Sequence, residues 1–433
     1  MSWQPVWVWP VGVGHPVRAG KLEVTANGAG LFTYDEDYVQ AYSSALDPVQ
    51  LRHLSAKHPI RVDAGDRNGI PGIIADAGPD SWGLKVLAQD IGYEPSPLEA
   101  LVRSPDDGVG NVAVGPLDQK RALGRMTIDA LVEAIDRRLA GYGTAVPFEV
   151  DRMLSPDTAL GGAKPKASVL IDGELWIAKL PEKGDPQHLP YFEAAALRMA
   201  DRLSIESANA RVQPLAQERS ILLVKRFDRT GTLRLGSASA LTVLGPAGQV
   251  QGDGRTYLAL ARRLKPWVRE ALPGTLENLW ARIVFNALIG NGDDHPRNHA
   301  LLKVDGKWRL SPAFDLVPTH IRRERLSLSM PFLEKDRQLT SFVTATNLVQ
   351  AGPTFGVPID VAHTRLIDMG SKVVDEWNMV MADIDAPESA VKQSAVVAER
   401  ADRMLGEAKA VDVAAVGRAL KSRRSAGWTW SPS

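Results

Sequence analysis

Apolar residues in the second half of the chain follow the spacing of a helix with a buried face. Between residues 276 and 289 they recur at the i, i+3, i+4, i+7 and i+8 positions, and Gly290 follows, a residue that favours helix ends. A second apolar stripe, with Glu193 near its start, covers residues 189–203. The pattern therefore predicts two core helices, over 276–289 and 189–203.

Short apolar runs on either side of Asp-Gly dipeptides predict two hairpins, because this dipeptide suits turns with positive φ angles. The expected strands of these hairpins cover residues 167–171 with 174–180 and residues 300–304 with 307–310. The turns are expected at Asp172-Gly173 and Asp305-Gly306. One more strand is expected over 220–227.

The first part of the chain mixes strand-like and helix-like runs and is expected to form a small subdomain. Within it, Asp80 or Ser81 is expected to cap a helix. Residues 104–118 are rich in glycine and proline and are interpreted as linker-like.

The composition excludes several classes of function. Fifty-one basic and 51 acidic side chains give a formal net charge of zero, so the electrostatic attraction of a basic chain for nucleic acid is missing. The absence of cysteine excludes disulfides, a thiol nucleophile and Cys-ligated metal. No apolar run approaches the roughly 18 residues of a membrane span, and no leader segment is visible, so a cytoplasmic protein is expected.

Several polar residues occur in the order that phosphoryl transfer from ATP requires. Asp293 precedes Asn298 by five positions, the interval found in the catalytic loop of protein kinases. Asp315 follows the next hairpin, where a kinase places a ligand of Mg²⁺. Upstream, Lys179 lies on the second strand of a hairpin and Glu193 begins the next helix, in the order of the kinase lysine and its glutamate.

Five longer stretches carry a resemblance to a known family. They are 77–83 (AGPDSWG), 161–167 (GGAKPKA), 225–229 (KRFDR), 290–300 (GNGDDHPRNHA) and 311–315 (SPAFD). The chain resembles the HipA-type serine/threonine kinases, toxins of type II toxin–antitoxin modules, over most of its length. The resemblance implies an α+β fold, two-lobed and protein-kinase-like, with a small N-terminal subdomain and a mainly helical C-lobe.

The resemblance also implies domain boundaries. The N-terminal subdomain would cover residues 1–120, the N-lobe core 150–230 and the helical C-lobe 231–420, and a disordered tail would cover 421–433.

The resemblance assigns roles to individual residues. Asp293 would be the catalytic base, with His295 and Arg297 in the loop around it, and Asn298 and Asp315 would hold Mg²⁺. Lys179 would bind the nucleotide phosphates. ATP would further be bound by a phosphate-side loop with Gly161, Gly162, Ala163, Lys164 and Lys166, and by a strand facing adenine with Val224, Lys225 and Phe227. Asp294 competes with Asp293 as the base, although it lies one residue too close to Asn298.

The family's biology implies growth arrest through phosphorylation of a translation component, such as an aminoacyl-tRNA synthetase. A HipB-like helix-turn-helix antitoxin would neutralise the protein and make its main contact with DNA. The sequence departs from the family pattern at one position. Well-characterised members autophosphorylate a serine there, and Ala159 occupies the aligned position in this chain. No autophosphorylation site is therefore assigned, and Thr158 and Ser155 are the neighbouring hydroxyl residues that could take the place of this serine.

Two alternative functions remain open at this point. A kinase-like scaffold or corepressor would act with the antitoxin and would need no metal ligands. An Asp/His metallohydrolase would use His295 and His299, whose i, i+4 spacing suits a helical metal pair, but Pro296 between them argues against one helical face.

Overall fold

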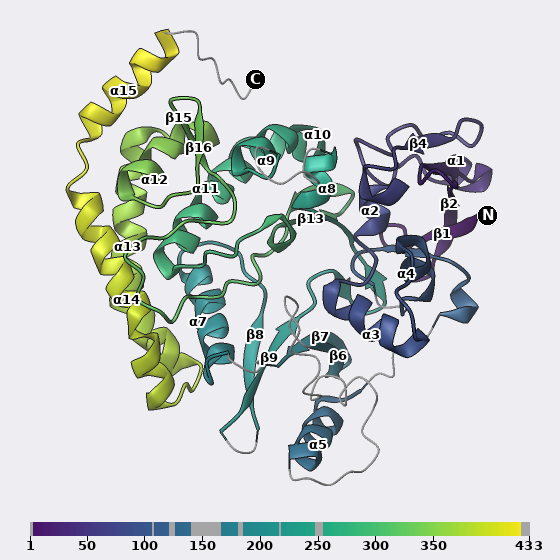
Figure 1. Cartoon of the computed structure of the whole chain (residues 1–433), viewed down its shortest axis with the longest axis horizontal. Helices are drawn as coiled ribbons and strands as arrows, with labels where there is room; N and C mark the ends of the chain where they lie inside the picture. The colour runs from purple at the N-terminus through teal and green to yellow at the C-terminus, as the bar shows by residue number, and fades with distance from the viewer. Residues whose placement is uncertain are drawn as a thin grey trace. The chain divides into compact units, whose positions relative to one another are not determined.

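The computed structural model of the chain describes residues 3–105, 108–120, 126–139, 166–180, 185–215, 218–246 and 254–425. The chain divides into two compact units. Unit 1 comprises residues 1–187, 212–249 and 300–309, and unit 2 comprises residues 188–211, 250–299 and 310–433. Figure 1 shows the helices and strands of both units and labels many of them.

The N-terminal part of unit 1 is built on a five-stranded antiparallel sheet. Its strands, in spatial order, are β4 (Ile60–Val62), β3 (Gly30–Tyr34), β2 (Val17–Val24), β1 (Gln4–Val8) and β5 (Val112–Val114). Alternate residues of β3 are buried, as expected of a strand with one face on the core. The helical segments here are α1 (Glu36–Ala41), η1 (Arg67–Gly69), α2 (Gly72–Ala75), α3 (Ser81–Ile91), α4 (Pro97–Arg103) and η2 (Leu117–Gln119).

Unit 1 also contains most of a four-stranded sheet. Its order is β6 (Lys166–Ile171), β7 (Glu174–Lys179), β9 (Ser220–Lys225) and β8 (Ala210–Pro214). One core cluster joins this sheet to α5 (Ile128–Leu139) and to Trp82 of α3. The sheet that carries Lys179 therefore shares a hydrophobic core with a helix of the N-terminal part.

The remaining strands of unit 1 are β10 (Arg229–Thr230), β11 (Leu233–Arg234), β12 (Gly236–Ser239), β13 (Ala300–Val304) and β14 (Lys307–Leu310), and α8 (Ala240–Leu244) follows β12. The order β12-β13-β14 makes a small sheet. The Asp76 carboxylate accepts hydrogen bonds from the Ser239 backbone N–H and the Thr242 hydroxyl, both over 2.7 Å. It therefore ties the end of α2 to the start of α8.

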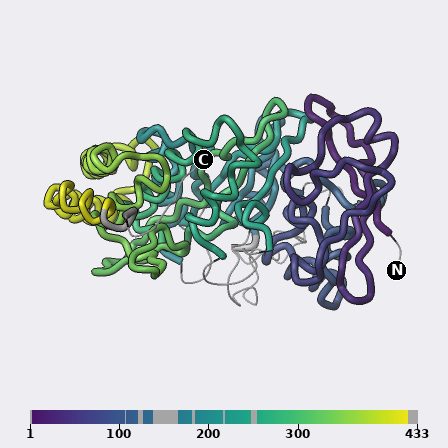
Figure 2. The backbone as a smooth tube through the Cα atoms, turned by 90° about the horizontal axis from the view of Figure 1, so that it is seen from above, coloured from purple at the N-terminus to yellow at the C-terminus, as the bar shows by residue number. Residues whose placement is uncertain are grey.

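Unit 2 is mainly helical. Its elements are α7 (Leu189–Arg202), α9 (Tyr257–Arg263), α10 (Lys265–Val268), η5 (Arg269–Ala271), α11 (Leu272–Ile289), η6 (Pro296–Asn298), β15 (Leu333–Lys335), β16 (Gln338–Thr340), α12 (Ala345–Ala351), η7 (Gly352–Phe355), α13 (Ile359–Asp383), α14 (Glu388–Lys409) and α15 (Val413–Ser425). The long helices α13 and α14 pack side by side, as Figure 2 shows in yellow-green and yellow. Trp377 of α13 is fully buried between them and donates to Ser394 of α14 over 3.0 Å.

The structure confirms most of the elements that the sequence predicted. The two core helices and both hairpins lie at the expected positions, and both Asp-Gly turns have positive φ angles, 52° and 79° at 172–173 and 49° and 77° at 305–306. Asp80 caps α3, because its carboxylate accepts from the Gly83 N–H over 2.9 Å.

Two sequence-based expectations were wrong. The stretch 104–118 is not a linker, because β5 lies within it and pairs with β1, a long-range contact that local composition does not reveal. The helical part does not end at residue 420 either, since α15 runs to Ser425 through lysine and arginine residues of high helix propensity. Residues 426–433 lie outside the described residues.

Candidate active site

The predicted catalytic loop leaves the C-terminus of α11. Gly290 ends this helix in the left-handed conformation, with φ of +74°, and the Asn291 N–H still donates to the Asn286 carbonyl over 2.9 Å. Leu279, Trp280 and most other α11 side chains are buried, so the helix is a rigid base. The loop therefore begins at a fixed position.

Backbone hydrogen bonds hold Asp293 in place. Its N–H donates to the Asn291 side-chain oxygen over 3.3 Å. Its carbonyl accepts from the His295 N–H over 2.9 Å and from Nδ2 of Asn298 over 2.8 Å. The residue itself is exposed, so the loop presents its carboxylate to solvent.

Asn298 has the amide orientation that a metal ligand needs. Because its Nδ2 is engaged by the Asp293 carbonyl, Oδ1 points elsewhere, and among the described residues no hydrogen bond reaches that oxygen. The side chain is 8% exposed. One contact thus connects the candidate base with a candidate Mg²⁺ ligand.

Burial decides between the two neighbouring aspartates. Asp294 is 1% exposed, and burial raises its pKa to about 7. Its carboxylate accepts hydrogen bonds from inside unit 2, among them one from the Ser329 N–H over 3.0 Å. Asp293 is therefore the residue that a substrate hydroxyl can reach.

The loop that carries Asp315 is fastened to the same helix, α11. Arg282 donates to the Ser311 carbonyl over 2.6 Å, and the Thr319 N–H donates to the Ile289 carbonyl over 3.3 Å. Between these points the Ala313 N–H donates to the Glu206 carbonyl over 2.7 Å. Asp315 has φ of +58°, a left-handed conformation that aspartate tolerates better than most residues. Helix α11 thus holds both the Asp293 loop and the Asp315 loop.

The two histidines do not form a metal pair. Nε2 of His299 lies 3.0 Å from the Tyr257 hydroxyl, and burial together with the charges of Arg282 and His295 lowers the pKa of His299 to about 3. Pro296 begins the short helix η6, so the two histidines do not share a helix face. Within the described ranges, no group of three or more His, Cys, Asp or Glu side chains is arranged to hold a metal ion. This geometry argues against the metallohydrolase.

The predicted nucleotide-binding residues lie mostly in unit 1. Lys179 ends β7 and is opposite Leu222 of β9. On β9, Val224 is buried and Lys225 pairs with Glu174 over 2.6 Å, and Phe227 follows the strand half-buried. Lys179, Val224 and Lys225 therefore belong to one sheet. Glu193 lies in unit 2 and is 3% exposed within α7.

The predicted phosphate-side loop falls largely outside the described residues. This applies to Gly161, Gly162, Ala163 and Lys164, and also to Ala159, Thr158 and Ser155. Lys166 begins β6, and its ammonium group forms an ion pair with Asp80.

Three charged residues of the stretch 225–229, Arg226, Asp228 and Arg229, form a buried ion cluster. Asp228 accepts from Nη2 of Arg226 and Nη1 of Arg229, each over 2.7 Å, and from the Gly110 N–H over 2.8 Å. Burial alone would raise the pKa of Asp228, but the two arginines outweigh it and hold the pKa well below its usual range. The cluster holds the end of β9 against residues 108–110, because Arg226 and Arg229 also donate to the carbonyls of Gly108 and Gly110.

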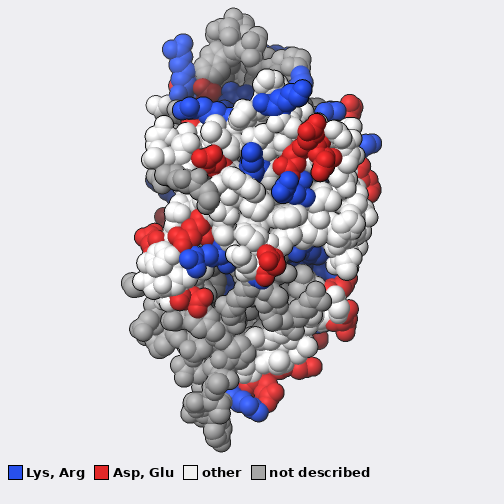
Figure 3. All heavy atoms as spheres, turned by 90° about the vertical axis from the view of Figure 1, so that its right-hand side faces the viewer, with Lys and Arg blue, Asp and Glu red and all other residues white. Residues whose placement is uncertain are grey.

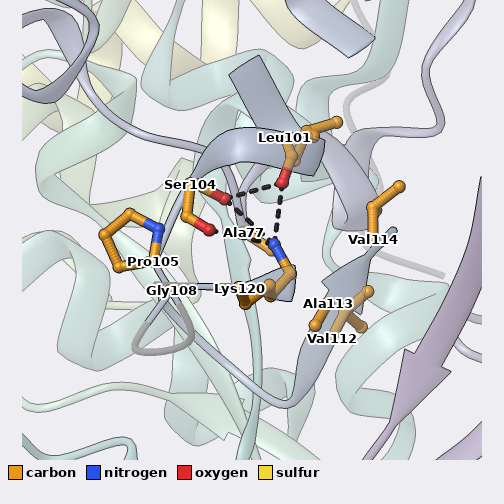
Figure 4. Close-up of a pocket in the computed structure, with 9 residues that line it drawn as sticks. All are labelled: Ala77, Leu101, Ser104, Pro105, Gly108, Val112, Ala113, Val114 and Lys120. Atoms are coloured by element: carbon orange, nitrogen blue, oxygen red, sulfur yellow. Dashed lines mark hydrogen bonds between the residues drawn. The ribbon is translucent and has the colours of Figure 1, made fainter. Parts of the chain in front are cut away.

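A small cavity in unit 1 is no candidate for the nucleotide. Its volume is about 10 Å³, enough for about one water molecule. Lys120 points into it and donates to the carbonyls of Leu101 and Ser104, each over 3.0 Å, which caps the C-terminus of α4 (Figure 4).

Sequence reasoning missed the buried residues beneath the catalytic loop, above all Tyr257 and Asn286. Tyr257 follows Thr256 at the start of α9 and belongs to no motif. Asn286 could have been found, because it and Arg282 are polar residues four positions apart in the otherwise apolar run 279–289.

Comparison with known families agrees with this geometry. The model of the HipA-like C-terminal domain matches residues 158–377, and the model of the HipA N-terminal domain matches residues 13–115. The chain belongs to the HipA family. The matched C-terminal region includes Asp293, Asn298 and Asp315.

Two individual proteins with similar sequences extend the match along the chain. The Sinorhizobium fredii protein named "Putative kinase Y4mE" is 26% identical over 417 residues, which cover 88% of this chain and 96% of that protein. "Putative kinase Y4dM" of the same organism is 28% identical over 159 residues, covering 34% of this chain and 38% of that protein.

A solved structure supports the fold. HipA of Shewanella oneidensis MR-1, in a complex with HipB and operator DNA, superposes with a TM-score of 0.68 at 17% identity, covering 94% of this chain and 99% of that one. The two-lobed, kinase-like fold class expected from the sequence is thereby confirmed. No helix in the described part of the chain is long and apolar enough to cross a membrane.

Proposed function

We propose that this HipA-family protein is an ATP-dependent serine/threonine protein kinase. The observation that carries the proposal is the attachment of two loops to α11. The loop with Asp293 and Asn298 leaves the end of this helix, and the loop with Asp315 is bonded to it through Arg282 and Ile289. One rigid helix thus supports a candidate base and two oxygen ligands, which is the set that phosphoryl transfer needs.

The donor set suits magnesium. An amide oxygen from Asn298 and a carboxylate from Asp315 are hard ligands, and Mg²⁺ bound with ATP is held by few protein groups, the other positions being taken by phosphates and water. When bound, Mg²⁺ would neutralise charge on the β- and γ-phosphates. The chain's own contribution is to hold the two ligands from one helix.

Asp293 has the exposure that a base acting on a protein hydroxyl requires. In the proposed reaction the hydroxyl oxygen of a serine or threonine forms a bond to the γ-phosphorus, the bond from that phosphorus to the β–γ bridging oxygen breaks, and ADP leaves. The hydroxyl proton passes to the Asp293 carboxylate. Lys179 would bind phosphate oxygens, so catalysis consists of positioning and electrostatic stabilisation.

The biological role proposed is that of a toxin in a toxin–antitoxin module. This rests on family membership and on the Shewanella HipA, whose structure contains HipB and operator DNA. By analogy, the partner is a helix-turn-helix antitoxin that makes the main DNA contact, and the substrate is a translation protein such as an aminoacyl-tRNA synthetase. Basic and acidic side chains are interspersed on the described part of the face in Figure 3, which fits DNA contact through a partner.

The proposal is tested by incubating the purified protein with Mg-ATP and a cell lysate and identifying new phosphosites by mass spectrometry. Asp293→Ala is the inactive control. Serine or threonine phosphosites that depend on Asp293 are expected. If the wild-type protein adds none, and Mg-ATP does not raise its thermal midpoint, the kinase-like scaffold is the better description.

A further inference from the structure

Asp294 stands next to the candidate base but faces the interior of unit 2. Its Oδ2 accepts a hydrogen bond from the Tyr257 hydroxyl and one from Nδ2 of Asn286 over 3.3 Å. Its Oδ1 accepts from the Ser329 N–H over 3.0 Å. The carboxylate is 1% exposed, so both of its oxygens are satisfied by protein donors.

These donors come from separate parts of unit 2. Tyr257 begins α9, Asn286 lies in α11, and Ser329 belongs to the segment downstream of the Asp315 loop. A single side chain therefore links the catalytic loop to two helices and to the chain that follows Asp315.

The Tyr257 hydroxyl extends the same network to the other end of the catalytic loop. It lies 3.0 Å from Nε2 of His299, the residue that follows Asn298. His299 is 4% exposed, so its ring is held by packing as well as by this contact. The exposed Asp293 and the candidate ligand Asn298 thus lie in a loop that is anchored from inside at residues 294 and 299.

Close packing at Gly292 supports this view independently. A Cβ atom at Gly292 would lie 3.2 Å from the Ser327 carbonyl oxygen, so the loop contacts the same downstream segment that supplies the Ser329 N–H. The loop is therefore restrained on both sides of Asp293.

Burying a carboxylate costs free energy, because the group loses its hydration. Replacing both partners of a buried hydrogen bond by apolar groups of the same shape can leave a protein about as stable or make it more stable. Hydrogen bonds with defined directions, however, fix a loop in one conformation, which apolar packing does less well. The arrangement therefore points to a requirement for loop geometry.

We propose that Asp294 is a positioning residue of the catalytic loop: its buried hydrogen bonds to Tyr257, Asn286 and Ser329 hold the neighbouring Asp293 in its exposed orientation. The inference deepens the proposed kinase function and rests on it for its catalytic consequence. The structural part of the inference is that this network restrains residues 291–299, and this part does not depend on any enzymatic activity.

The experiment compares Asp294→Ala, Asp294→Asn and Tyr257→Phe with the wild type. Tyr191→Phe is the matched control, because it makes the same substitution at a buried tyrosine of α7 in the same unit. Two quantities are measured on folded protein: steady-state phosphorylation kinetics, and amide hydrogen exchange of peptides covering 291–299.

In Asp294→Ala, kcat is expected to fall about 100-fold, the scale of a misplaced reacting group. KM for ATP should change less than about twofold, since ATP binding does not use Asp294. Exchange over 291–299 should become faster. Tyr257→Phe should show a smaller loss of the same kind, Asp294→Asn should recover part of kcat because it keeps an acceptor for Ser329, and Tyr191→Phe should match the wild type.

The outcomes separate the two proposals. Unchanged exchange over 291–299 in Asp294→Ala would overturn the positioning role, whatever the activity. A fall in thermal midpoint with unchanged kcat per folded molecule would also overturn it, because that is what a merely structural role produces. If Asp294→Ala does not fold, the isosteric Asp294→Asn and Tyr257→Phe give the same readouts. If Asp294→Ala shows faster exchange but the wild type phosphorylates no protein, the proposed kinase function is wrong and the positioning role still holds.

Discussion

Nδ2 of Asn298 donates to the backbone carbonyl of Asp293 over 2.8 Å. This contact closes the catalytic loop on itself and leaves Oδ1 of Asn298 as the atom available to a metal. A candidate ligand therefore also shapes the loop that carries the candidate base, and the two tasks use different atoms of one amide.

Asn298→Asp separates these two tasks. The carboxylate keeps an oxygen for Mg²⁺ but replaces the donor by an acceptor that repels the Asp293 carbonyl. We expect kcat to fall while the Mg²⁺ concentration for half-maximal activity does not rise, measured by titrating Mg²⁺ at saturating ATP. Asn347→Asp is the matched control, because Nδ2 of Asn347 donates to the Phe342 carbonyl over 2.9 Å elsewhere in unit 2. Equal kcat in Asn298→Asp and the wild type would contradict this reading.

Asp293→Ala should remove activity without unfolding the protein. General base catalysis contributes about 100- to 10,000-fold, so kcat should fall by an amount in that range. The side chain is exposed, and the free energy of unfolding should change by less than about 0.5 kcal/mol. Kinetics and urea unfolding on the same preparation check both parts. A wild-type kcat in this variant would transfer the role of the base to another residue.

Local sequence patterns predicted α11, both hairpins and their turns, because each depends on residues close in sequence. The strand β5 was missed because its pairing with β1 is not local. The same reason applies to the site. The spacing of Asp293, Asn298 and Asp315 is readable along the chain, but the contacts of Asp294 with Tyr257 and Ser329 exist only after folding.

Gly290→Ala should destabilise unit 2. The residue has φ of +74°, and an added Cβ would lie 1.6 Å from Nη1 of Arg400, a side chain only 5% exposed. Alanine at a positive φ costs more than about 1 kcal/mol, and displacing Arg400 adds to this. Gly406→Ala in α14 is the control, because nothing lies within 4 Å and helix propensity favours alanine by about 0.5–1 kcal/mol. Equal thermal midpoints for the two variants would refute the prediction.

Asp228→Ala should destabilise unit 1. It leaves the charges of Arg226 and Arg229 without their buried partner, which costs about 3–5 kcal/mol in comparable sites. Removing the exposed partner of Lys225 with Glu174→Gln in the same unit should cost less than about 1 kcal/mol. Urea unfolding of the two variants measures the contrast, and similar losses in both would show that burial of the cluster is energetically unimportant.

The raised pKa of Asp294 predicts the direction in which the free energy of unfolding changes with pH. Burial raises this pKa to about 7 from the 3.8 of an exposed carboxyl group. Between these values the folded protein keeps a proton that the unfolded chain has released, so the stabilising contribution is complete below pH 3.8 and is lost as the pH rises toward 7.

Asp294→Asn has no such proton, whereas Tyr257, His299 and Arg282 around it are the same in both proteins. The unfolding free energy of the wild type, minus that of Asp294→Asn, should therefore decrease from about pH 5 to about pH 7 and level off above that. Urea unfolding at several pH values measures it. A difference that is constant with pH would mean that Asp294 is ionised in the folded protein throughout this range, and that its hydrogen bonds offset the whole cost of burying the charge.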